Sequence, residues 1–217
     1  MNYTEVTKVI DRVGKKEWDW INQAIDSNST GLINWPWQTG DKVGATNGYR
    51  LHLVEGIGEK LIENSPISET CLSQYCERES AYWGLNLKCK KVSYSKDLDL
   101  LKNLALIDGF KFLYLSVNQL GWVSVRKKSE TYSFCFDLET EAGELWQHTG
   151  ITWPISLCVN VQDLHDALNY KSSSSCIYLP KDKTKPLIVT HSIIGTPYRL
   201  KAIVMPLRED PSNFTLE

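Results

Sequence analysis

The sequence predicts an α+β fold in which repeated strand–helix–strand meander units build antiparallel sheets, with short helices on one face. Strand-like runs outnumber helical patterns, with about one short helix for each fifty residues, whereas a doubly wound parallel sheet needs a helix after each strand. Three stretches, 3–58, 92–140 and 153–208, also share the order strand, short helix and strand meander. This shared order predicts an internal repeat whose units pack side by side.

The composition is typical of a globular protein without a membrane segment. The chain has 217 residues, 42% apolar and 23% charged, and a formal net charge of −2, so no overall basic character indicates a nucleic-acid partner. No run reaches the roughly 18 apolar residues of a membrane span, and the first residues lack the apolar core of a secretory signal. The six cysteines lack the close pairing of a zinc site. We therefore expect a cytoplasmic protein with free thiols, no metal and no cofactor.

Apolar residues at helical spacing predict four helices, over 15–29, 68–84, 95–109 and 160–170. The first presents Trp18, Ile21 and Ile25 on one face. The third opens with a serine and ends before a glycine, and the fourth opens with Asn160, which is a favourable N-cap residue. The last helix is acidic through Asp163 and Asp166, and such charges usually lie on a solvated face.

The strands are predicted from short runs of β-branched and aromatic residues bounded by turn residues. These runs are 110–118, 122–127, 131–139, 155–161, 175–180, 186–193 and 199–207. A further strand begins in "ATNGYRLHL", residues 45–53, where Asn47-Gly48 is a strong turn signal because both residues tolerate positive φ.

Three segments resemble the bacterial sliding clamp, the β subunit of the replicative DNA polymerase. "ATNGYRLHL" resembles the ATDG-(H/Y)-RLA turn of that family, and "RLKAIVMPLRED" resembles its terminal V-M-P-M-R-L strand. The stretch from "GFKFLYLSVNQLGWVSVRK" to "ITWPISLCVNVQDLHDALNY" has the order of the family's last domain, with its N-Q-L turn and N-V-x-x-L-x-D-A-L helix. The resemblance covers most of 92–208 and a shorter part of 1–58.

The chain also departs from the family pattern. A bacterial clamp subunit has three domains, whereas this chain is far shorter, and residues 59–91 match nothing in the family. Asn47 stands for the family's aspartate, Leu207 stands for a methionine, and nine residues follow Arg208. The resemblance therefore implies a clamp-type fold with a domain over 1–91 whose second half is degenerate, a second domain over 92–208 and a tail over 209–217. Because a clamp ring has six domains, self-association is expected, and two domains per chain would need three chains.

In the family, the glycine-arginine turn and the terminal strand line an apolar groove that accepts short linear peptides of polymerases, the clamp loader and repair proteins. The resemblance carries this peptide-binding role to Thr46, Gly48, Tyr49, Arg50 and Leu51 on one wall of the groove, and to Val204, Met205, Pro206, Leu207 and Arg208 on the other. On this interpretation Arg50 either holds the turn or meets a polar part of the peptide, and Pro206 ends an edge strand.

A clamp encircles double-stranded DNA and contacts phosphates without reading the sequence. The implied DNA-binding residues are Lys8, Arg12, Lys15, Lys16 and Lys102. Acidic residues interrupt this lining, so a clamp fold need not bring DNA binding with it. We therefore expect a non-enzymatic replication or repair accessory protein that binds partner peptides and encircles DNA.

Two other functions stay open. The chain is alternatively a clamp-derived peptide-binding or regulatory adaptor that does not encircle DNA. A small enzyme with a Cys or His centre, for instance Cys158 and His191, is the second alternative, although no catalytic motif is present. Trp35 and Trp37, which flank Pro36, form either ordinary packing or an exposed aromatic platform.

Overall fold

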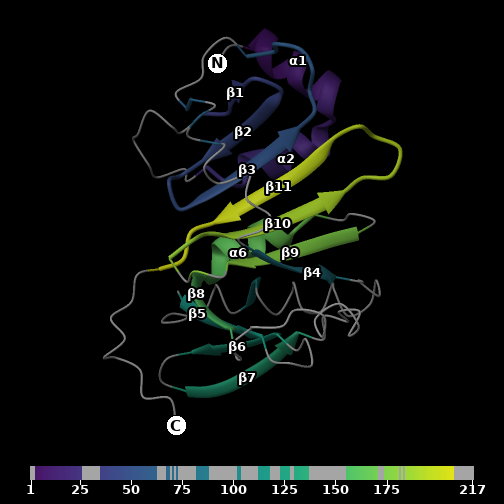
Figure 1. Cartoon of the computed structure of the whole chain (residues 1–217). Coiled ribbons are helices and arrows are strands. Elements are labelled where there is room, and N and C mark those ends of the chain that lie inside the picture. The colour runs from purple at the N-terminus through teal and green to yellow at the C-terminus, as the bar shows by residue number, and fades with distance from the viewer. Residues whose placement is uncertain are drawn as a thin grey trace.

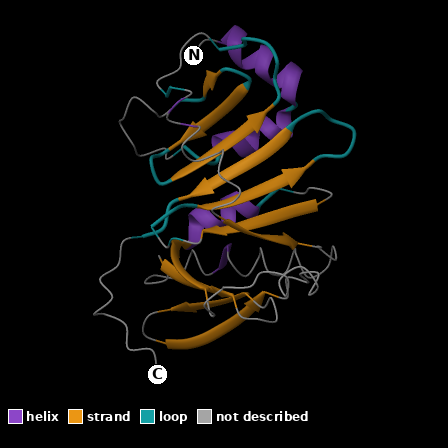
Figure 2. Ribbon diagram, in the orientation of Figure 1, coloured by secondary structure: helices purple, strands orange, loops and turns teal. Residues whose placement is uncertain are grey.

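The structure is a computed structural model. The residues that it describes are 3–25, 35–62, 67–68, 70, 72, 82–87, 102–103, 112–117, 123–127, 130–136, 155–170, 174–180, 182 and 184–207. Within these residues the chain forms two antiparallel sheets and short helices (Figures 1 and 2). None of the helices in this described part is long and apolar enough to cross a membrane.

The larger sheet has seven strands in the order β1-β2-β3-β11-β10-β9-β4. Its strands are β1 (Trp37–Thr39), β2 (Lys42–Thr46), β3 (Arg50–Glu55), β4 (Tyr82–Leu87), β9 (Ser174–Pro180), β10 (Leu187–Ser192) and β11 (Arg199–Val204). The smaller sheet has the order β7-β6-β5-β8. Its strands are β5 (Phe112–Val117), β6 (Val123–Lys127), β7 (Glu130–Phe136) and β8 (Ile155–Asn160).

The pairing of β3 with β11 joins the two ends of the described chain at the middle of the large sheet (Figure 1). In this antiparallel register Leu51 lies opposite Ile203, and Arg50 lies opposite Val204. Two segments that are about 150 residues apart in the sequence therefore become direct neighbours through a main-chain ladder.

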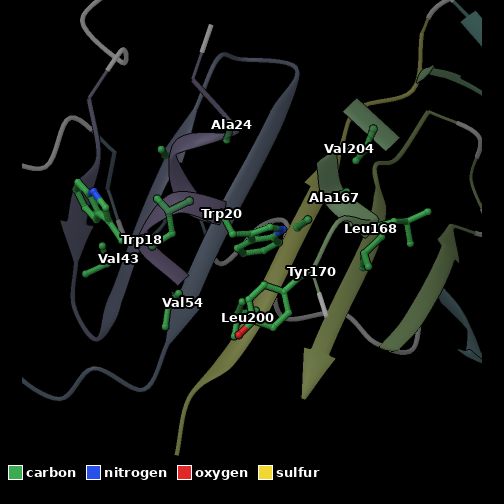
Figure 3. Packing of buried hydrophobic residues seen from close by; sticks show 14 of the residues in the cluster. Trp18, Trp20, Ala24, Val43, Val54, Ala167, Leu168, Tyr170, Leu200 and Val204 are labelled. Atoms are coloured by element: carbon green, nitrogen blue, oxygen red, sulfur yellow. The ribbon is translucent and has the colours of Figure 1, made fainter. Parts of the chain in front are cut away.

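One face of the large sheet, here called the helix face, is covered by α2 (Lys15–Asn22) and α6 (Val161–Leu168), with α1 (Tyr3–Val13) packed against α2 (Figure 2). Every second residue of a strand faces this side, so Val54 of β3 and Leu200 of β11 are buried beneath the helices. Trp20 lies at the centre of this core, beside Tyr170, between α2 and the end of α6 (Figure 3).

The opposite face, here called the outer face, carries a second and smaller apolar cluster. Its buried members are Trp37, Leu51, Leu53, Leu72, Ile188 and Ile203, with Ile67 and Tyr178 packed against them. Gly44 makes room for this cluster, because a Cβ atom there would lie 2.5 Å from Leu53 Cδ2 and 2.6 Å from the His52 carbonyl oxygen.

The structure confirms the predicted α+β fold, and it confirms several of its elements with different bounds. The helix predicted from residue 15 is α2, which ends at Asn22. The helix predicted from Asn160 is α6, with the Asn160 side chain accepting hydrogen bonds from the main-chain N–H groups of Gln162 and Asp163. The predicted meander of strands at 110–118, 122–127 and 131–139 is β5, β6 and β7.

Other predictions were wrong or incomplete. The helix predicted over 68–84 does not extend to its end, because residues 82–87 form β4 at the edge of the large sheet. Helix α1 was not predicted at all, although its buried Val9 and Val13 have helical spacing. Of the helix predicted over 95–109, the described residues are Lys102 and Asn103, and both are helical. The loop 171–173, the end of the predicted helix 15–29 and the tail 209–217 lie outside the described residues.

The seven-stranded sheet includes strands from both sides of the domain boundary predicted at residue 91. Strands β1 to β4 precede that boundary, and β9 to β11 follow it. The division into domains over 1–91 and 92–208 stays a prediction.

Candidate functional site

The β2–β3 turn is held by two side chains that bond to its main chain. The Asn47 carboxamide oxygen accepts hydrogen bonds from the N–H groups of Tyr49 (3.0 Å) and Arg50 (2.9 Å). The Thr46 hydroxyl accepts from the Gly48 N–H (3.0 Å) and donates to the Arg50 carbonyl oxygen (2.6 Å). Such Asx- and Thr-type bonds rigidify a turn without help from the rest of the protein.

Gly48 is the residue with positive φ in this turn, at 92°, while no described residue other than glycine has positive φ. The prediction that both Asn47 and Gly48 use positive φ was therefore wrong for Asn47, whose part is played by its side-chain oxygen. A Cβ on Gly48 would meet nothing within 4 Å, so the glycine serves backbone conformation and not close packing. The turn projects Tyr49 outward with 64% of its surface exposed.

The segment after β11, Met205–Leu207, runs from this turn to the smaller sheet. The Met205 N–H donates to the Tyr49 carbonyl oxygen (2.8 Å), and the Leu207 N–H donates to the Cys158 carbonyl oxygen (2.9 Å). Pro206 lies between them without an N–H group to donate. All three residues of the segment are half-buried. The expectation that Pro206 ends an edge strand was wrong, since β11 lies between β3 and β10 in the sheet interior.

Arg50 turns away from this surface and connects the turn to α6. Its guanidinium is buried, and Nη1 donates to Asp163 Oδ1 (3.0 Å) and to Asp166 Oδ2 (2.6 Å). Its Nε has no hydrogen-bond partner among the described residues. Of the two roles expected for Arg50, the geometry provides the first, because the side chain fixes the turn to a helix.

Asp166 is the centre of this buried polar network. Its Oδ1 accepts hydrogen bonds from Gln162 Nε2 (2.7 Å) and His165 Nδ1 (2.9 Å). Its main-chain oxygen accepts from the indole N–H of Trp20 (3.1 Å), which ties α6 to α2. The prediction of a solvated acidic face was therefore wrong, because Asp163 and Asp166 are both buried and neutralised by Arg50.

The structure brings the predicted peptide-binding residues together but on different faces. Thr46 and Leu51 face the outer side, whereas Arg50 and Val204 face the helix side and are buried. Arg208 lies outside the described residues. The surface that remains at the meeting point consists of Gly48, Tyr49, Met205, Pro206 and Leu207, and we call it the junction site.

The predicted DNA-binding cations are mostly engaged by other groups. Arg12 pairs with Glu59 (3.1 Å), and Lys15 pairs with Asp19 one helical turn away (3.0 Å). The Lys16 ammonium lies 3.9 Å from the centre of the Tyr170 ring. Lys8 and Lys102 are exposed, on α1 and on the described helical residues near 102 respectively.

The buried histidines of the large sheet have structural partners. His191 Nε2 lies 2.8 Å from the Ala167 carbonyl oxygen, which can only accept, so Nδ1 accepts the hydroxyl proton of Ser175 at 2.7 Å. His52 stacks on Trp20 with ring centres 4.2 Å apart and bonds through Nδ1 to the Trp20 carbonyl oxygen (2.7 Å). Burial lowers the pKa of each histidine to about 4.

Neither chemical centre considered from the sequence has an accessible reactive group here. Cys158 is buried, and both ring nitrogens of His191 are engaged by Ser175 and Ala167. Within the described ranges no cluster of three or more histidine, cysteine, aspartate or glutamate residues is arranged to hold a metal. Trp35 and Trp37 do not share a platform, since Trp35 is 63% exposed and Trp37 is buried in the outer-face cluster.

Sequence reasoning missed the partners of Arg50. A lone arginine within an apolar strand and two aspartates at i, i+3 on a short helix were the available signals, because a buried guanidinium requires carboxylates nearby. The distance of 113 residues between Arg50 and Asp163 kept these signals apart.

Comparison with solved structures identifies the architecture. The chain is similar to the DNA polymerase sliding clamp of Pseudomonas aeruginosa, with a TM-score of 0.60 and 11% identity over 95% of this chain and 64% of that one. It is also similar to the β clamp of Helicobacter pylori (TM-score 0.58, 12% identity, 89% of this chain and 64% of that one). The β chain of DNA polymerase III from Streptococcus pneumoniae gives a TM-score of 0.56 with 14% identity, over 94% of this chain and 63% of that one.

The chain therefore has the sliding-clamp type of α+β fold, and it spans less than two thirds of the length of these clamps. No known protein-family pattern matches the sequence, and no curated protein matches it either.

Proposed function

Given this fold, we propose that the chain is a sliding-clamp-like accessory protein of DNA replication or repair that binds short linear peptides of partner proteins at the junction site. The observation that carries the proposal is the β3–β11 pairing, with the Met205–Tyr49 bond that continues it. It brings together two distant sequence motifs whose resemblance to clamps had been noted separately.

The physical properties of the junction site suit a peptide with one or two apolar anchors. Tyr49 offers a large, exposed aromatic ring on a turn that is already rigid, so little conformational entropy is lost on binding. Met205 is unbranched and polarisable, which lets it adapt to different side chains. Apolar anchors seated against a preformed surface supply most of the affinity in such complexes.

The proposed role is binding without catalysis. The thiol of Cys158 and the imidazoles of His52 and His191 are buried, which favours a structural role over that of a reactive centre. Alkylation of accessible thiols should therefore leave peptide binding unchanged, and a Cys/His enzyme would instead lose its activity.

A random peptide library displayed on phage tests the peptide-binding role without a known partner. Panning should enrich peptides with two apolar or aromatic residues within about five positions, since one short groove accommodates few anchors. Synthetic versions should bind Tyr49→Ala and Met205→Ala at least about tenfold more weakly than the unaltered protein. Tyr3→Ala is the matched control, because Tyr3 is an exposed tyrosine (87%) on α1. Equal loss in that control, or unchanged binding to both site variants, would refute the proposal.

Encircling of DNA is the remaining part of the proposal, and the charges of the described residues favour a second candidate. Arg12 and Lys15 are paired with carboxylates and Lys16 lies on Tyr170, so few free cations are available for phosphates. An adaptor that binds clamp-type peptides without encircling DNA fits these contacts better than a basic ring does.

Two measurements separate the two candidates. A ring of self-associated chains has a native mass of several subunits and stays on circular DNA while sliding off linear DNA. The adaptor stays bound to neither DNA form at moderate salt. Cytoplasmic location and association with replication or repair proteins belong to both candidates.

A further inference from the structure

The connection between β3 and β4 has to cross most of the large sheet. In the strand order, β11, β10 and β9 separate these two sequential strands. Its described residues are Ile67, Ser68, Thr70 and Leu72, here called the connector. Ile67 and Leu72 pack on the outer-face cluster, and Leu72 is only 2% exposed. The crossover therefore passes over the outer face.

The connector is held there by few interactions. The Thr39 hydroxyl donates to the Ile67 carbonyl oxygen (2.6 Å), and the Leu72 N–H donates to the Ser68 carbonyl oxygen (3.2 Å), which closes one helical turn. Two apolar side chains, five residues apart on one short segment, thus fill a surface built by strands β1, β3, β9, β10 and β11. Such an arrangement resembles the way in which a short peptide with two anchors occupies a groove.

The covered surface is continuous with the junction site. Leu51 and Ile203 lie opposite each other beneath the connector, and Tyr49 and Met205, which bond to each other, follow two residues further along their strands. An extended peptide that starts on Tyr49 and continues along the outer face therefore meets the position of Leu72.

A buried donor on this surface lacks an acceptor. The indole N–H of Trp37 has no hydrogen-bond partner in the described part of the chain, although Trp37 is only 1% exposed. A buried N–H without a partner is costly, and the carbonyl oxygen of a bound peptide is the usual remedy.

We infer that Ile67 and Leu72 occupy in cis the apolar half of the peptide site, and that a partner peptide extending from the junction site displaces them. This inference rests on the proposed function for the nature of the ligand. Two states of one surface, closed by the connector or open to the peptide, then compete, so the connector lowers the apparent affinity by the fraction of molecules that are closed.

The first test removes the internal competitor. In the variant Ile67→Ser/Leu72→Ser, a fluorescein-labelled synthetic peptide with the sequence of residues 65–74, with serine at the cysteine position, should bind at least about tenfold more tightly than to the unaltered protein. A scrambled peptide of the same composition is the control. Equal binding to both proteins, or equal binding of the scrambled peptide, overturns the inference.

The second test uses the unaltered protein, so it decides the question even where the double variant does not fold. Hydrogen exchange at the Leu72 N–H should be at least about 100-fold faster than at Leu53 and Ile203, because the connector opens without global unfolding. Excess unlabelled segment peptide should accelerate exchange at Leu72 further, and the scrambled peptide should not. Protection at Leu72 equal to that of the two strand residues, or no response to the segment peptide, contradicts the inference.

The outcome is separable from that of the proposed function. The segment-peptide experiments need no partner peptide, whereas library panning does not involve the connector sequence. Binding of the segment peptide without any enriched library peptide would support the connector and remove the proposed function, and the reverse result would do the opposite.

Discussion

The Arg50 network gives the sharpest prediction about stability. In Arg50→Met, a side chain of similar length replaces the buried guanidinium, so Asp163 and Asp166 lose their common cation. Both carboxylates remain below the surface of the protein, held by α6. The perturbation therefore creates two uncompensated buried charges and not a cavity.

The magnitude follows from the distances. At 3.0 and 2.6 Å, each pair has a gross attraction of about 5–6 kcal/mol at an effective dielectric constant near 20. Much of this is offset by desolvation, and removal of one partner of a buried pair typically costs about 3–5 kcal/mol. A single domain has a free energy of unfolding of about 5–15 kcal/mol, so the expected loss is a large part of the total.

Equilibrium unfolding in urea, followed by tryptophan fluorescence, measures this loss, and Trp20 reports directly because its indole bonds to Asp166. Arg50→Lys should lose less, since both ion pairs use the single nitrogen Nη1, which an ammonium can replace in part. Lys15→Met is the matched surface control, because the Lys15 side chain is 75% exposed and its pair contributes only about 0.3–0.5 kcal/mol.

A rescue variant provides the decisive comparison. Arg50→Met combined with Asp163→Asn and Asp166→Asn removes all three charges and should regain at least half of the lost stability. A loss in Arg50→Met no larger than that in Lys15→Met, or a triple variant no more stable than the single one, would show that the network does not hold the turn to α6.

The remaining predictions concern acid and the glycines. Both buried histidines have folded pKa values of about 4 against 6.5 in the unfolded chain, so the unfolded state binds more protons below pH 6.5. The free energy of unfolding should be highest above pH 6.5 and fall towards pH 4 by up to about 3 kcal/mol per histidine, and urea titrations that show a flat profile would contradict this. His52→Phe should remove about half of that pH dependence, because it retains the stack on Trp20. Gly44→Ala should cost about 3 kcal/mol through collision with the His52 carbonyl oxygen and Leu53, whereas Gly48→Ala should cost only about 1–2 kcal/mol of backbone strain. Equal losses at the two glycines, measured in the same urea assay, would refute the distinction.

Local patterns predicted much of the fold. Turn chemistry placed the bend at Asn47-Gly48, and the N-cap at Asn160 placed the start of α6, because both depend on neighbouring residues alone. The end of the helix predicted over 68–84 was wrong, because sheet pairing of β4 with β9 overrides local helical spacing there. Helix α1 was missed because its mean hydropathy is low and only two of its side chains are buried.

The candidate site was predictable in part. The resemblance of two short motifs led to the expectation that residues near 48 and 205 meet, and the bond between Tyr49 and Met205 confirms their proximity. The resemblance could not predict which side chains face outward. Strand alternation sends Arg50 and Val204 to the helix face, and only the full register of β3 against β11 settles this. The connector was also unpredictable, since residues 59–91 have no counterpart in the resemblance.

The central position of β11 has a consequence during synthesis. Strand β3 ends at Glu55 and its neighbour β11 begins at Arg199, which a ribosome adds 144 residues later. At about 5–20 residues per second, the first hairpin emerges some 7–30 s before its neighbour exists, with one edge unpaired. During translation that edge is open to other nascent chains or to a chaperone, so the yield of native protein should depend on elongation speed more than it does for a protein built from local contacts.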